Sequence, residues 1–441
     1  MFLEITQKKN DTIVAKSQKR GATMGLQTLS EQELICTFIA LALLLAGAYL
    51  CGTLFERIKA PRVVGEIIGG MLFGSFLFPF FPKAVAGIFN SYEGQGKVLN
   101  IFYQLGLVFL MFLSGYNTNL EIDKKNLKTI GCVFVGATFL PMLGAIPFIQ
   151  LFEEEYIGTM NNSISFALVF TIGVAITSIP VISKIFFDMG VMNTTFSNTV
   201  LTVSTFQDLC LWILLNAATR IAVSGEVKLV EMLIVAFVTL GLFAIAKLVT
   251  KYVHVWKKSF QTINFYSVSF IALLLVCALL YIAGINIMYS AFLVGYIVKA
   301  VVGTEQETIA KIDGIKNFAF SFFIPIYFAL VGIQLDILNN FSFLRFALFF
   351  VIAFSLEAVG TLIMLIPTDL NRVTKINFAV TMNARGGPGI VLATVAYSYG
   401  IINLEFFTVL ILTTMLSSLI AGYWLRWQQK KDATIFMNLT K

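Results

Sequence analysis

Charged residues are scarce in this chain of 441 residues: Asp, Glu, Lys and Arg together make up 12%, whereas 58% of the residues are hydrophobic. Soluble domains usually carry about 25% charged residues, so a protein exposed only to water is excluded. The apolar residues fall in blocks of about 20, the length that a helix needs to cross a bilayer. The composition therefore predicts an all-α, polytopic membrane protein that resides in the lipid bilayer.

Histidine and cysteine are also few. The single histidine, His254, lies in a basic loop, and all five cysteines lie inside apolar blocks. The sequence has no CxxC pair, Walker loop or nucleophile elbow, so we expect no enzyme, no cofactor, no disulfide framework and no metal beyond a transported alkali cation. The formal net charge of +7 is spread over alternate loops rather than one patch, and nucleic acid is therefore not an expected partner.

About thirteen apolar segments are predicted to span the membrane: 32–55, 62–81, 98–116, 129–152, 163–187, 196–222, 229–252, 263–284, 286–303, 317–334, 341–366, 373–398 and 403–427. The polar start of the chain has no apolar run before residue 35, so no cleaved signal peptide is expected.

The loops between these segments differ in charge. Basic residues such as Lys124, Lys125, Lys257 and Lys258 gather on one side, and the acidic run 153–155 lies on the other. The positive-inside rule puts the basic side in the cytoplasm. This predicts a cell-membrane protein, in a bacterial inner membrane, with its N-terminus outside and its C-terminus cytoplasmic. The basic N-terminal tail is the one feature that disagrees.

Two of the segments contain residues that break helices at membrane depth. The fifth contains Thr177-Ser178-Ile179-Pro180, and the twelfth contains Asn383, Gly386, Gly387 and Pro388. Proline removes an amide donor, and unpaired backbone in lipid costs several kcal/mol unless it lines a cavity. Two broken segments, seven apart and each followed by one more helix, are typical of inverted repeats with a binding site at the breaks.

The deepest ionisable residues are Asp208, Glu357 and Arg385. Charges at this depth are functional candidates because holding them there is costly. Burial disfavours the ionised form of a carboxylate, so Asp208, directly after the first broken segment, can hold a proton or a monovalent cation in turn. The alternative is an aspartate that is hydrogen-bonded to a neighbouring helix for packing.

The residues around these charges leave several roles open. Gln207 can coordinate a cation through its carbonyl oxygen or tie two helices together, and Thr177 and Ser178 offer hydroxyl ligands. Arg385 either offsets the negative end of a helix at the second break or pairs with Glu357. In the second span, Gly65xxxGly69 and Gly70xxxGly74 predict close helix packing.

Five of these segments, taken in order, resemble the monovalent cation:proton antiporters of the Kef and NapA type. They are residues 61–70, residues 105–115, the Thr177-Ser178 pair, the Gln207-Asp208 pair and residues 383–387. The resemblance extends over residues 35–425. It implies an NhaA/NapA-like fold with two crossed discontinuous helices, a homodimer, and an elevator-type exchange of K⁺ or Na⁺ for H⁺ in which Asp208 binds the ion. A glutamine before the aspartate is similar to Kef-type potassium:proton antiporters.

The same resemblance implies a division of the chain: a polar tail (1–30), a transmembrane domain (31–428) and a short cytoplasmic tail (429–441). Within the transmembrane domain it implies scaffold helices (32–116 and 263–334), core helices (129–222 and 341–427) and a linker helix (229–252).

Two departures from the family pattern stand out. Kef proteins end in a large regulatory domain and this sequence does not, so gating by such a domain in the same chain is not expected. Glu357 occupies a position where many relatives have a lysine that pairs with the core aspartate. One carboxylate favours one-for-one electroneutral exchange, whereas two acids sharing the core would titrate as a coupled pair. A cation channel and a sodium-coupled symporter of an organic solute are the alternatives to an antiporter.

Overall fold

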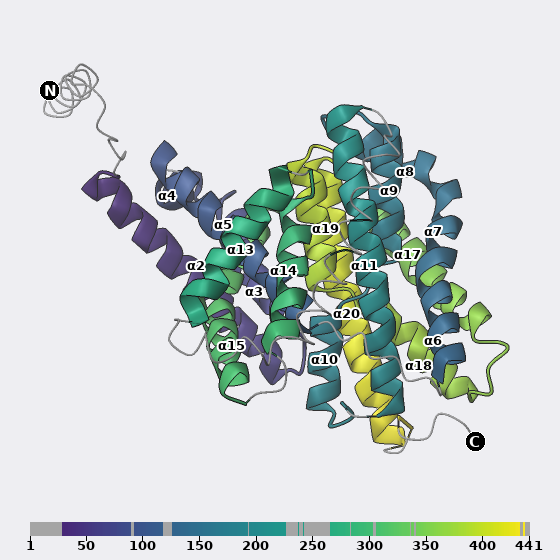
Figure 1. The fold of residues 1–441 in the computed structure, drawn as a ribbon. Helices are drawn as coiled ribbons and strands as arrows, with labels where there is room; N and C mark the ends of the chain where they lie inside the picture. Colours follow the sequence, from purple (N-terminus) through teal and green to yellow (C-terminus); the bar gives the residue numbers. More distant parts are fainter. Residues whose placement is uncertain are drawn as a thin grey trace, which may run out of the picture.

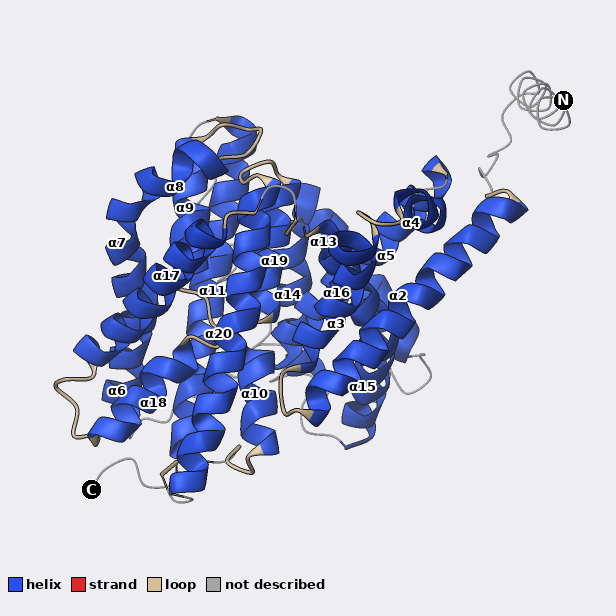
Figure 2. Cartoon of the chain, turned by 180° about the vertical axis from the view of Figure 1, so that it is seen from behind, coloured by secondary structure: helices blue, strands red, loops and turns tan. Residues whose placement is uncertain are grey.

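Helices account for the regular structure of the chain (Figures 1 and 2). The structure is a computed structural model that describes residues 29–89, 92–117, 126–192, 194–225, 237, 241, 265–282, 284–302, 306–335, 337–338, 341–432 and 435–436. The predicted linker helix 229–252 lies outside the described residues apart from positions 237 and 241. Within the described ranges no strand forms, which agrees with the all-α prediction.

The helices form two groups that lie side by side, the first on the left of Figure 1 and the second on the right. The first group contains α2 (Glu31–Arg57), α3 (Arg62–Met71), α4 (Pro82–Phe89), α5 (Glu93–Asn117), α13 (Phe265–Ile282), α14 (Ile287–Val302), α15 (Gln306–Phe318) and α16 (Ile324–Gln334). The second group contains α6 (Leu127–Phe134), α7 (Leu140–Ala145), α8 (Ile149–Tyr156), α9 (Ser163–Val174), α10 (Ile179–Asp188), α11 (Thr195–Ser224), α17 (Phe343–Met364), α18 (Arg372–Met382), α19 (Gly387–Ser398) and α20 (Leu404–Lys431).

Eight helical stretches of the described residues are long and apolar enough to cross a membrane: Glu31–Arg57, Gly94–Asn117, Leu127–Tyr156, Ser163–Asp188, Thr195–Ser224, Ala310–Gln334, Phe343–Met364 and Leu404–Lys431. Shorter apolar helices run over Tyr266–Ile282 and Ile287–Lys299. The chain is therefore a multi-pass membrane protein, and the count of about thirteen spans stays a prediction.

Glycines set the close packing of the first group. A Cβ atom at Gly65 or Gly69 would overlap the backbone of α2, and one at Gly70 or Gly74 would overlap the backbone of α16. Helix α3 is thus held between two neighbours at near backbone contact, which is how small residues drive helix association where lipid supplies no hydrophobic force. The close packing predicted from the two GxxxG repeats is confirmed.

An aromatic cluster supports one end of the second group. Phe170 of α9 lies 5.3 Å, centroid to centroid, from Phe152 of α8 and 5.4 Å from Phe349 of α17. Phe406 of α20 lies 5.2 Å from Phe349. Such tilted and edge-to-face pairs are favoured by the ring quadrupoles. The cluster fixes α9, the first half of a broken helix, against the short helix α8 and the longer helices α17 and α20.

Candidate ion-binding site

Two helices are interrupted at the predicted segments. Helix α9 ends at Val174 and α10 begins at Ile179, while α18 ends at Met382 and α19 begins at Gly387. In each pair the second half starts with a proline in its first turn, where the missing amide costs no helical hydrogen bond. At α10 the side chain of Ser178 also caps the new helix by accepting a hydrogen bond from the backbone of Val181 at 3.4 Å. Local chemistry therefore explains both interruptions.

The two breaks contact each other and satisfy each other's backbone. The amide of Ser178 donates to the carbonyl of Ala384 at 2.8 Å. The hydroxyl of Thr177 donates to the C-terminal residue of α18 at 2.6 Å, and Arg385 donates to the C-terminal residue of α9 at 2.8 Å. Each break thus supplies a side chain to the carbonyl end of the opposite half-helix, where helices leave acceptors unsatisfied.

Gly386 is the point where the breaks leave no space, and alanine there should destabilise the fold. A Cβ atom at Gly386 would lie 2.9 Å from Cβ of Ser178 and closer still to its hydroxyl and to Val181. At the neighbouring Gly387 the nearest atom, a Leu110 side-chain carbon, would be 3.6 Å away. We expect Gly386→Ala to lower the free energy of unfolding by roughly 1–3 kcal/mol and Gly387→Ala to lower it by less. Thermal unfolding in detergent measures both. Equal losses would contradict this geometry.

Glu357 and Arg385 form a buried ion pair next to the breaks. Their side chains are 0% and 1% exposed, and Nη2 of Arg385 lies 2.9 Å from Oε2 of Glu357. The other carboxylate oxygen of Glu357 lies 3.2 Å from the Thr177 hydroxyl, whose single proton it shares with the nearer carbonyl of Met382. The predicted pairing of Arg385 with Glu357 is present. The predicted contact with a helix end at the second break is wrong in its location, because Arg385 contacts the end of α9 at the first break.

Gln207 uses its amide group to tie helices together. Its Nε2 donates to the carbonyl of Ala137 at 3.0 Å and to that of Ala175 in the first break. Its Oε1 is buried and has no hydrogen-bond partner among the described residues. The nitrogen thus ties the helices together, and the oxygen is left unpaired among the described residues.

Asp208 lies buried at 1% exposure, and neither of its carboxylate oxygens accepts a hydrogen bond within the part of the chain that the structure describes. The same holds for the hydroxyls of Ser204, one turn earlier on α11, and Thr138, which follows the Ala137 carbonyl that binds Gln207. Buried polar atoms are almost always paired, so each of these unpaired oxygens requires an explanation. Hard oxygen ligands of this kind suit an alkali cation.

Sequence reasoning had not selected Ser204 and Thr138. The spacing of four residues from Ser204 to Asp208 places both side chains on one face of a helix, and this signal was present in the sequence. Nothing in the sequence pointed to Thr138, because its relation to the site depends on how the segment 135–139 packs against α11.

A cavity of about 1980 Å³ leads from the surface towards the site. It lies between the two helix groups, and its lining includes Thr202 and Thr205 on α11, Pro180 at the first break and Gly387 at the second. Thr205 precedes Asp208 by three residues, about one helical turn. The inner end of the cavity therefore lies about one turn from the carboxylate.

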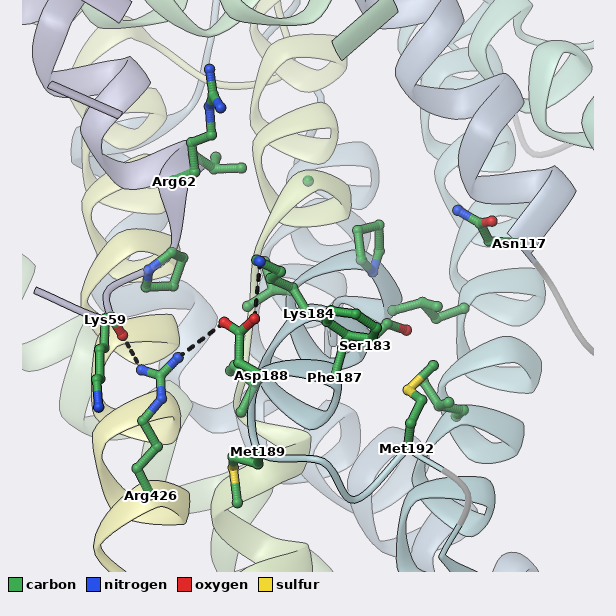
Figure 3. Close-up of a pocket in the computed structure, with 18 of the residues that line it drawn as sticks. Lys59, Arg62, Asn117, Ser183, Lys184, Phe187, Asp188, Met189, Met192 and Arg426 are labelled. Carbon is green, nitrogen blue, oxygen red and sulfur yellow. Dashed lines mark hydrogen bonds and ion pairs between the residues drawn. The ribbon is translucent and has the colours of Figure 1, made fainter. Parts of the chain in front are cut away.

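Charged residues surround the mouth of this cavity (Figure 3). Arg426 of α20 points between two partners: it donates to the main-chain carbonyl of Lys59, in the α2–α3 connection, and lies 3.5 Å from a carboxylate oxygen of Asp188. Asp188 in turn pairs with Lys184 at 2.9 Å. These contacts join the two helix groups at the mouth, and their partly exposed ion pairs add little stability.

The structure thus joins most of the residues selected from the sequence. Hydrogen bonds link Thr177, Glu357, Arg385 and Asn383, and the amide of Ser178 donates to Ala384 in the second break. Gln207 contacts the first break, Asp208 follows Gln207 on α11, and Pro180 and Gly387 line the cavity. This is a membrane protein with two interrupted helices meeting beside a buried carboxylate, the arrangement of a secondary ion transporter.

Comparison with known proteins identifies the family. The sequence model described as "Sodium/hydrogen exchanger, transmembrane" matches residues 41–431, and the chain belongs to this family. The Na⁺/H⁺ antiporter NhaS4 of Synechocystis is 24% identical over 385 residues, which cover 85% of this chain and 92% of NhaS4. The Na⁺/H⁺-K⁺ antiporter GerN of Bacillus cereus is 24% identical over 87% of this chain and 94% of GerN.

Two further matches extend the comparison. The K⁺/H⁺ antiporter 1 of Saccharomyces cerevisiae is 26% identical over 83% of this chain, and the match spans only 43% of the yeast protein. The solved structure of the sodium proton antiporter MjNhaP1 from Methanocaldococcus jannaschii at pH 8 superposes with a TM-score of 0.62 at 15% identity, covering 92% of this chain and 99% of MjNhaP1. The second match shows a shared fold, and the antiporter resemblance drawn from the motifs is confirmed at the level of the family.

Proposed function

We propose that this chain exchanges K⁺ or Na⁺ for H⁺ across a membrane, with Asp208 holding the cation and the proton in turn. The observation that carries the proposal is the buried carboxylate without a hydrogen-bond partner among the described residues, placed beside two touching helix breaks and about one turn beyond a surface cavity. The relatives are named for sodium in some cases and potassium in others, so both ions belong to the proposal.

Exchange follows from the free-energy cost of burying the Asp208 carboxylate when it holds neither a proton nor a cation. An ionised carboxylate without a counter-ion is strongly disfavoured in a dry environment. It becomes neutral either by taking a proton or by binding a monovalent cation. Only the two neutral forms can cross between the sides at low cost, so each cation carried one way requires a proton carried the other. The oxygens of Ser204, Thr177, Ser178 and Gln207 are the candidate additional ligands.

Electroneutral exchange is supported by the second acid of the core. Glu357 is paired with Arg385 at 2.9 Å, so this pair contributes no net charge and Glu357 has a partner other than Asp208. With Asp208 as the single carboxylate that changes its ligand, one proton is exchanged for one monovalent cation. The proposal therefore does not include a proton shared between Asp208 and Glu357.

Alternating access is proposed to occur by movement of the second helix group, the core, against the first, the scaffold. The reciprocal contacts of the two breaks support crossed discontinuous helices related by an inverted repeat. The basic mouth of the cavity, with Lys59, Lys184 and Lys430 in its lining, supports a cytoplasmic opening by the positive-inside rule. Helix α20 then ends in the cytoplasm. A homodimer in the cell membrane completes the proposal.

Proton flux in proteoliposomes across a cation series tests this function. We expect an outward gradient of K⁺ or Na⁺ to drive proton entry, and we expect the rate to be unaffected when the membrane potential is imposed with an ionophore for an ion that the protein does not carry. Flux that responds to voltage would contradict electroneutrality. Currents without a counter-ion would indicate a channel, and flux that requires an organic solute would indicate a symporter.

A further inference from the structure

Three buried hydroxyls join the two helix groups at a point that the exchange site does not use. Tyr103 of α5 donates to the hydroxyl of Thr394 on α19 at 3.2 Å, and the hydroxyl of Tyr327 on α16 lies 3.1 Å from the same oxygen. The exposed fractions are 7% for Tyr103, 0% for Tyr327 and 1% for Thr394. The two tyrosine rings lie 5.1 Å apart, centroid to centroid. We call these three residues the hydroxyl cluster.

The hydroxyl cluster lies beyond the inner end of the cavity. Gly387 and Leu110 are in the lining of the cavity, and so is Phe328, which directly follows Tyr327 on α16. Thr394 is seven residues further along α19 than Gly387, and Tyr103 is seven residues further along α5 from Leu110, on the side away from Asn117 at the mouth. Seven residues of helix correspond to about 10 Å, so on α5 and α19 the cluster lies beyond the cavity lining, on the side away from the mouth, and on α16 it adjoins the lining.

The geometry points to a gate. We propose that the hydroxyl cluster is the barrier that closes the route to Asp208 from the side opposite the cavity, and that opening to that side requires Thr394 to leave both tyrosines. This rests on the proposed alternating movement of the two groups. Thr394 belongs to the proposed core and both tyrosines to the proposed scaffold, so sliding of one group along the other must separate them. A partly separated cluster would leave buried hydroxyls without partners, which is costly. The joined and the separated arrangements are therefore two discrete states.

A cysteine reporter between the site and the gate can detect this opening. Val391 is fully buried and lies four residues beyond Gly387 and three before Thr394, on the same face of α19. Val391→Cys, in a chain whose five native cysteines are replaced by alanine, should react with a small maleimide only when the far side opens. Thr202→Cys, in the lining of the cavity, reports the opposite opening.

The test removes the cluster without leaving an unpaired hydroxyl, using Tyr103→Phe, Tyr327→Phe and Thr394→Val together. Losing two buried hydrogen bonds should raise the labelling rate of Val391→Cys roughly tenfold, while labelling of Thr202→Cys stays level or falls. Thr394→Ser, which keeps the hydroxyl, should label like the parent. The matched control is Thr408→Val, since the buried Thr408 hydroxyl bonds to Leu404 within its own helix at 2.9 Å.

The outcomes separate the gate from the proposed function. Labelling of both reporters is also measured in chains that carry Asp208→Asn, because the labelling readout does not depend on transport activity. An unchanged rate at Val391→Cys, or a rise at both reporters that indicates general loosening, would overturn the gate. If the labelling results overturn the gate but cation-driven proton flux is normal, the assignment of the chain as an exchanger stays intact. Size-exclusion profiles and melting temperatures of each variant verify folding before labelling is compared.

Discussion

Asp208→Asn protein in liposomes will lose cation-dependent proton movement and fall to the rate of liposomes without protein. An asparagine has nearly the same shape but can neither release a proton nor neutralise a cation, so both half-reactions of the exchange stop. Folding should survive, because the carboxylate oxygens of Asp208 have no hydrogen-bond partner in the described part of the chain. The melting temperature of the variant in detergent should therefore equal or exceed that of the wild type.

The matched control is Asp369→Asn, the same substitution at an exposed position between α17 and α18. It should leave both flux and stability unchanged. Cation-driven proton flux that persists in Asp208→Asn would end the assignment of this carboxylate as the exchange site. A large loss of stability in Asp208→Asn would instead indicate that the carboxylate has a structural role in packing, the alternative raised by its sequence position.

Glu357→Gln will cause a large loss of stability. It leaves the Arg385 guanidinium buried at 1% exposure without its carboxylate partner, and breaking a buried pair from one side costs about 3–5 kcal/mol. The double variant Glu357→Gln/Arg385→Gln removes both charges and should be more stable than Glu357→Gln alone. Thermal unfolding of the purified proteins in one detergent provides the comparison.

Glu66→Gln is the control for this prediction. Glu66 also pairs with an arginine, at 2.8 Å, but the side chain of that partner, Arg62, is 36% exposed and can be solvated after the change. The loss should therefore be smaller than for Glu357→Gln. A normally stable Glu357→Gln protein with a shifted pH optimum of exchange would contradict the structural role, and it would show that Glu357 takes part in proton or ion binding.

The parts of the architecture that depend on local chemistry could be predicted from the sequence. Both helix interruptions were foreseen, since a proline and neighbouring glycines or serine restrict the backbone whatever surrounds them. The close packing of α3 was foreseen for the same reason, because glycines four apart form a smooth face on any helix.

The contacts between distant segments could not be predicted in the same way. Arg385 reaches the end of α9 across 211 positions of sequence, and Tyr103 meets Thr394 across 291. A single sequence contains no local signal for such pairs, because they depend on which helices become neighbours. The unpaired state of Asp208 could not be predicted for the same reason. Its burial could be inferred from the apolar surroundings, but only the packed structure shows that the neighbouring Gln207 donates its amide hydrogens to Ala137 and Ala175.

The central claim is that one carboxylate holds a proton and a cation in turn, and proton release from the purified protein tests it most directly. Saturating K⁺ or Na⁺ is added to protein in weakly buffered detergent solution at a pH where the site is protonated, and the released protons are counted with a pH dye. The account predicts close to one proton per chain, and none from Asp208→Asn. Cation binding without proton release, or equal release from Asp208→Asn, would contradict it.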